Sequence, residues 1–169
     1  ADGGSAMIAT SIIVALSLVM LVYGILYIAN GIRGNGNGDA LVRYGVPLLF
    51  IGLIGFVLST GIVVAVTNAP DPAPAAEAAM LASSGINNIG GIFFSLGFAA
   101  IFFAMASRDE YKKLLANGAG VVALVAFALS IIGFSSTELS ALMTQLVGLT
   151  YIIHTVYAIY LGWGLFARE

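Results

Sequence analysis

Five long apolar stretches dominate this sequence, and their length limits what the chain can fold into. A helix needs about 20 mostly apolar residues to cross the hydrocarbon core of a bilayer. Because every backbone group in lipid must be satisfied within its own segment, these continuous, non-alternating runs favour helices over a barrel. The sequence predicts an all-α polytopic membrane helix bundle, a single integral membrane domain over residues 1–169, with five transmembrane helices near 6–32, 41–67, 85–106, 114–134 and 138–166.

The composition agrees with a membrane protein. Hydrophobic residues make up 60% of the chain and charged residues 8%, whereas soluble domains carry about 25% charged residues. The first apolar stretch does not have the form of a cleavable signal, because "ADGGSA" holds no basic residue and the run from Met7 to Ile32 is too long. We therefore expect the first stretch to be a retained transmembrane helix.

The connections between the stretches contain residues that commonly end or begin helices. Gly31 has the residue type that adopts the left-handed C-cap geometry, and Asp39 is expected to be the N-cap of the second helix. The Pro-rich segment 68–78 cannot be helical throughout. Ser107 and Ser135 are each followed three residues later by Glu, which is the spacing of a capping box, so we expect both to be N-caps.

The charges predict the orientation of the bundle. In a five-span arrangement every basic residue falls on one side of the membrane: Arg33, Arg43, Arg108, Lys112, Lys113 and Arg168. The other side holds Asp2, Asp71, Glu77 and Glu138 and no basic residue. The positive-inside rule then predicts an N-terminus outside and a cytoplasmic C-terminus. Four or six spans would break this sorting.

Several classes of function lack the residues that they need. A net charge of −2 excludes a basic nucleic-acid surface, and the absence of Cys excludes thiolate chemistry. One His and no carboxylate pair at membrane depth argue against a metal site, a cofactor site or an enzyme. The "GNGNGD" segment has no Lys-Ser/Thr continuation and is not a phosphate loop.

Small and polar residues within the spans are the remaining signals. Glycines in the second, third and fourth stretches are typical of close helix packing, and some of their faces could instead line a narrow pore. The fifth stretch carries a polar stripe formed by Ser140, Thr144, Tyr151, His154 and Tyr157. The first carries Tyr23, Tyr27 and Asn30 near one face, and Asn87, Asn88 and Ser130 add polar groups to the third and fourth.

Polar groups in lipid usually face the protein interior, so we expect His154 to be buried beside polar groups of another helix. The polar stripe of the fifth stretch has three interpretations: interhelical hydrogen bonding, a pathway for a small polar solute, or a proton-sensing or ligand site around His154.

The segment "LSLVMLVYGILYIANGIRGN" resembles the opening helix of the urea/amide channel family (AmiS/UreI). The similarity runs over Leu16, Leu18, Val19, Gly24, Ile25, Ile28, Asn30, Gly31 and Ile32. "LGFAAIFFAMA" is similar to a pattern of the family's third helix through Gly97, Phe98, Ile101 and Phe102. The family has six spans and several later Trp residues, whereas this chain has room for five spans and holds Trp163 alone. The resemblance implies a channel for small neutral solutes, with one pore in each protomer of a ring.

Two hypotheses follow from these observations. The first is a passive channel for a small uncharged solute such as urea or a short amide, in the cytoplasmic membrane of a prokaryote. The second is a non-catalytic accessory or structural subunit of a larger membrane complex. We expect the lipid bilayer and, for the channel, a neutral solute and further copies of the chain as partners. The expected pore or polar stripe comprises Tyr27, Asn30, Ser95, Phe98, Thr144, Tyr151, His154 and Tyr157.

Overall fold

The computed structural model describes residues 2–34, 36–69 and 73–166. These residues form five helices: α1 (Asp2–Ile32), α2 (Asp39–Thr67), α3 (Ala73–Ala106), α4 (Lys113–Ser135) and α5 (Thr137–Phe166). All five are long and apolar enough to cross a membrane. The predicted all-α bundle of five membrane-length helices is thus confirmed.

Helix α3 begins well before the predicted start of its span at residue 85. It starts at Ala73, because the Ala-rich stretch that follows favours a helix and Pro74 is tolerated within the first turn. The predicted break in segment 68–78 is confirmed, since α2 ends at Thr67.

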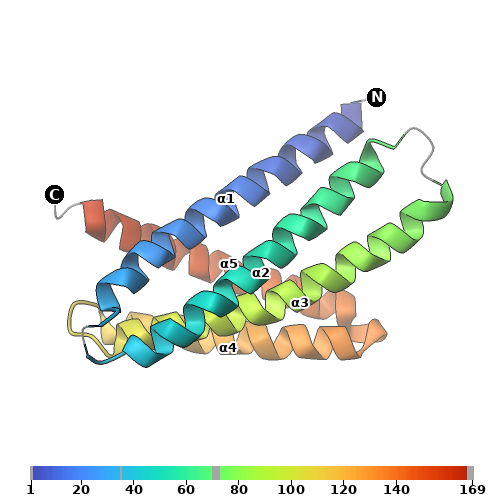
Figure 1. The fold of residues 1–169 in the computed structure, drawn as a ribbon. Helices are drawn as coiled ribbons and strands as arrows, with labels where there is room; N and C mark the ends of the chain where they lie inside the picture. The colour runs from blue at the N-terminus through green and yellow to red at the C-terminus, as the bar shows by residue number, and fades with distance from the viewer. Residues whose placement is uncertain (1, 35, 70–72, 167–169) are drawn as a thin grey trace.

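Successive helices run in opposite directions (Figure 1). The α1–α2 and α3–α4 connections lie at one end of the bundle, together with the C-terminal end of α5. We call this end, which includes residues 33–34, 36–43 and 107–113, the basic end, because Arg33, Arg43, Arg108, Lys112 and Lys113 all belong to it. Arg168 and Asp71 lie outside the described residues. Ion pairs at this end join Arg43 to Asp39, Arg108 to Glu110 and Lys113 to Asp109.

Helix α3 is the centre of the bundle. Of its most apolar stretch 72% is buried, against 22–28% for the other four helices. Phe94, Phe98 and Phe102 are each at most 2% exposed and form the middle of the core. Helices α2 and α4 pack directly on α3, while α1 packs mainly on α2 and α5 mainly on α4. All four keep broad apolar surfaces on the outside, as expected for a bundle in lipid.

Helices α2 and α3 touch backbone to backbone through glycines. A Cβ added at Gly52 would lie 2.6 Å from the Cβ of Phe94 and 2.7 Å from the carbonyl oxygen of Gly90. A Cβ at Gly97 would lie 2.9 Å from the carbonyl oxygen of Gly45. Small residues allow this close approach where lipid offers no hydrophobic drive for association. At these positions the glycines serve close helix packing, as predicted, and do not line a pore.

The turn between α1 and α2 differs from the predicted caps. Gly31 is helical, and the left-handed residues follow it, at Gly34, Gly36 and Gly38. Gly38, with φ of 90°, is the N-cap of α2, and a Cβ there would lie 2.8 Å from the carbonyl oxygen of Ala104. Asp39 is therefore not the N-cap but the first helical residue. Its carboxylate accepts hydrogen bonds from the Gly34 N–H and from Arg43 Nε, both at 2.8 Å.

Ser107 and Ser135 are not N-caps either. Helix α4 begins only at Lys113, and Ser107 donates its hydroxyl hydrogen bond to the carbonyl of Ala104 at the end of α3. Ser135 is the last residue of α4 and donates to the carbonyl of Ile131. A serine hydroxyl can satisfy itself on a carbonyl of the preceding turn, and in both places this local bond prevails over the capping box.

Candidate functional site

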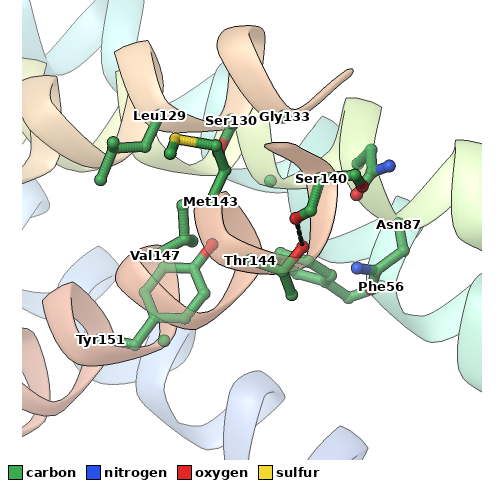
Figure 2. Close-up of a pocket in the computed structure, with 13 residues that line it drawn as sticks. Phe56, Asn87, Leu129, Ser130, Gly133, Ser140, Met143, Thr144, Val147 and Tyr151 are labelled. Carbon is green, nitrogen blue, oxygen red and sulfur yellow. Dashed lines mark hydrogen bonds between the residues drawn. The ribbon is translucent and has the colours of Figure 1, made fainter. Parts of the chain in front are cut away.

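A cavity of about 250 Å³ lies between the middle of α3, the C-terminal part of α4 and the N-terminal half of α5, with Phe56 of α2 beside it (Figure 2). We call it the α4 cavity, because α4 contributes one of its walls. Its lining is uncharged and combines amides and hydroxyls with apolar groups: Phe56, Asn87, Asn88, Gly91, Leu129, Ser130, Gly133, Ser140, Met143, Thr144, Val147, Gly148 and Tyr151.

Gly91 is a buried part of the lining of the α4 cavity. A Cβ at this glycine would lie 3.7 Å from the Tyr151 hydroxyl and 3.9 Å from both Ser130 Oγ and Phe56 Cζ. The hydroxyls of Ser130 and Thr144 each donate to a carbonyl of their own helix, which leaves their oxygens able to accept a further hydrogen bond. The cavity can therefore hold a small neutral molecule with hydrogen-bonding groups.

A second cavity, of about 300 Å³, has walls from α1, α2, α3 and α5, and we call it the α1 cavity. It is more apolar and is lined by Val14, Leu18, Leu21, Phe56, Thr60, Asn87, Phe94, Phe98, Tyr151, His154 and Thr155. Phe56, Asn87 and Tyr151 belong to both cavities. These three side chains form the partition between the two spaces.

Two further hollows continue along the seam between α1 and α5 toward the basic end. The first, of about 200 Å³, is apolar and shares Leu21 with the α1 cavity. The second, of about 290 Å³, shares Ile28 and Leu161 with the first and reaches Lys112 in the α3–α4 connection. A chain of four cavities therefore follows α5 for most of its length.

Aromatic rings pack tightly against the partition. The ring centroid of Phe94 lies 4.8 Å from that of Phe98, and Phe98 stacks on His154 at 5.5 Å. Phe102 lies 5.5 Å from His154 and 5.4 Å from Tyr157. These rings fix the imidazole and fill the core between the α1 cavity and the basic end.

His154 is 3% exposed, and its Nε2 lies 3.2 Å from the carbonyl oxygen of Ala119 on α4. The prediction that His154 is buried beside a polar group of another helix is confirmed. A carbonyl oxygen can only accept a hydrogen bond, so Nε2 carries the hydrogen. In the neutral ring Nδ1 is then an acceptor.

Three buried polar atoms have no hydrogen-bond partner among the described residues: Ser95 Oγ, the Tyr151 hydroxyl and His154 Nδ1. The Ser95 hydroxyl lies within interaction range of the Tyr151 hydroxyl. An unsatisfied buried polar group costs about 1–3 kcal/mol. Tyr151 and His154 line the α1 cavity, whereas Ser95 lines none of the four cavities. Unpaired polar groups on the wall of a cavity are typical of a site for a polar molecule.

The structure gathers part of the predicted stripe. Ser95, Phe98, Tyr151, His154 and Tyr157 lie within one buried cluster. Thr144 lines the α4 cavity. Tyr27, which is 67% exposed, and Asn30 lie on the outer face of α1 and line none of the four cavities.

The cavities also contain residues that were not in the predicted pore. Asn87 and Gly91 are four residues apart and share a face of α3, and Ser130 faces them from α4. Their helical spacing was a usable signal, but only the packing of α4 against α3 shows that they line one space.

No protein-family model matches the chain, and no curated protein and no solved structure shows significant similarity to it.

Proposed function

We propose that this protein is a passive membrane channel for a small uncharged solute, such as urea or a short amide. The observation that carries the proposal is the chain of cavities along α5, in which each cavity shares lining residues with the next. The polar α4 cavity serves as the entrance, and the partition at Tyr151 closes the route in the described conformation.

The lining supports a neutral solute over an ion. The residues of the α4 and α1 cavities carry amide, hydroxyl, imidazole and aromatic groups, and none of them is an acid, a Lys or an Arg. An ion at membrane depth needs a ring of charges or carbonyls to replace its hydration shell. A neutral solute needs only a few hydrogen bonds.

The open seam between α1 and α5 supports assembly with further chains. Exposed Tyr23 and Tyr27 on α1 favour the second candidate, an accessory subunit of a membrane complex, because polar groups on an outer face can contact another protein. In the channel proposal, copies of this chain cover the same face and close the seam.

For the orientation we propose an N-terminus outside and a C-terminus in the cytoplasm, in a prokaryotic cytoplasmic membrane. Its support is the gathering of basic residues at one end of the bundle. Single cysteines at Asn37 and Ala73 in this Cys-free chain should react with an impermeant maleimide from opposite sides, Ala73 from outside. Reaction of both from one side contradicts the arrangement.

The test of the channel is stopped-flow uptake of urea and acetamide into proteoliposomes. We expect faster uptake than into protein-free liposomes, without an increase in the conductance of small ions. Uptake equal to that of protein-free liposomes, by protein with native helix content and a homogeneous assembly, contradicts the channel and favours the accessory subunit.

A further inference from the structure

The two ring nitrogens of His154 have different surroundings, and this difference decides which of them is left to bind a solute. Its Nε2 points to Ala119 on α4, whereas the walls of the α1 cavity come from α1, α2, α3 and α5. The hydrogen on Nε2 is therefore already used in a hydrogen bond to α4, a helix that contributes no wall to that cavity. The unpartnered Nδ1 is the atom left to interact with a solute, and in the neutral ring it can only accept a hydrogen bond.

We propose that Ser95, Tyr151 and His154 form a binding site that selects neutral solutes carrying an N–H or O–H group. The solute donates a hydrogen bond to His154 Nδ1. Its own acceptor oxygen receives a hydrogen bond from the hydroxyl of Tyr151 or Ser95. The inference rests on the proposed function, because it names the specificity-determining residue of the same route.

Rotation of the Tyr151 side chain gives access to this site. All three polar atoms are covered in the described conformation, and the ring of Tyr151 lies 6.5 Å from the imidazole. Tyr151 borders both the α4 and the α1 cavity, so there is space on either side into which its ring can turn. The backbone-contacting helices α2 and α3 need not move.

A solute without a donor leaves Nδ1 buried and unpaired, so the site should reject it. Propionamide and N,N-dimethylformamide are isomers with the same atoms, and only propionamide has N–H groups. We expect protein-dependent uptake of propionamide to exceed that of N,N-dimethylformamide by roughly tenfold. A ratio of this size is what the cost of leaving one buried polar group without a partner predicts.

His154 is the single histidine of the chain, so its ring can be observed directly. We expect ¹⁵N-histidine NMR of the full chain in lipid to show hydrogen on Nε2 and a bare Nδ1. Propionamide should shift the Nδ1 resonance, and N,N-dimethylformamide should leave it in place. No response to propionamide, or an equal response to both isomers, overturns the proposal.

A matched pair of variants separates solute recognition from structural support. His154→Asn places a polar atom near the position of Nδ1, and His154→Gln places one near Nε2. We expect His154→Asn to keep the preference for propionamide and His154→Gln to lose it roughly tenfold. The opposite outcome in folded variants assigns His154 to packing against α4 and overturns the site.

The two proposals fail in different ways. Uptake of both isomers at equal rates by the native protein supports the channel and contradicts the binding site. A shift of the Nδ1 resonance that is specific to propionamide, without any protein-dependent uptake, supports the binding site and contradicts the channel.

Discussion

Replacement of Gly52 by leucine is expected to abolish the folded bundle. Even a Cβ at this position would lie 2.6 Å from the Cβ of Phe94 and 2.7 Å from the backbone nitrogen of the same residue. Neither backbone can retreat without separating α2 from α3, the central helix. We expect Gly52→Ala to lower the free energy of unfolding by about 3 kcal/mol, the upper end of the usual cost of overpacking. This outweighs the roughly 1 kcal/mol that alanine gains in helix propensity.

Gly61 provides the matched control on the same helix. A Cβ there meets no atom of the described structure within 4 Å apart from its own helix and chain neighbours. Gly61→Leu should therefore keep its thermal transition and its elution profile in detergent, while Gly52→Leu loses the folded species. Equal stability of the two variants would show that the α2–α3 contact is looser than described.

Replacement of Gly91 by leucine is expected to stop solute uptake while the protein stays folded. The nearest atoms to a Cβ at Gly91 lie at 3.7–3.9 Å, which is ordinary contact, and all three belong to residues that line the α4 cavity. We expect the remaining side-chain atoms of the leucine to fill part of the α4 cavity, the proposed entrance. We expect urea uptake to fall at least tenfold toward the rate of protein-free liposomes, an increase of about 1.4 kcal/mol or more in the barrier.

Gly118→Leu on the exposed face of α4 is the control for this substitution, because a Cβ there has no contact within 4 Å beyond its own helix and chain neighbours. It should leave uptake unchanged. Native uptake rates in a folded Gly91→Leu protein would mean that the solute does not pass through the α4 cavity.

The number and type of helices could be predicted from hydropathy, because each span is a property of one continuous segment. The exact ends could not. The turn after α1 offers several glycines, and only packing against Ala104 makes Gly38 the N-cap. Likewise, Ser107 and Ser135 have the spacing of a capping box, but their hydroxyls donate to carbonyls of the preceding helical turn.

For the candidate site, the spacing of residues along one helix could also be predicted from the sequence, but their burial could not. The spacing of Tyr151, His154 and Tyr157 on one face of α5 was visible in the sequence, and all three lie in or against the core. Tyr23 and Tyr27 have equally regular spacing and are largely exposed. In a small bundle each outer helix keeps a lipid face, and the amphipathic tyrosine ring is tolerated there.

The glycine contacts between α2 and α3 also limit how this protein can change shape. Two helices whose backbones interlock cannot slide by one turn, about 5.4 Å, because a side chain would then occupy the place of a glycine. The pair should behave as a rigid body during any gating cycle. In the proposed channel, motion is then left to side chains and to the helices other than α2 and α3. Spin labels on α2 and α3 should keep one fixed separation, while labels on α1 and α5 report any opening.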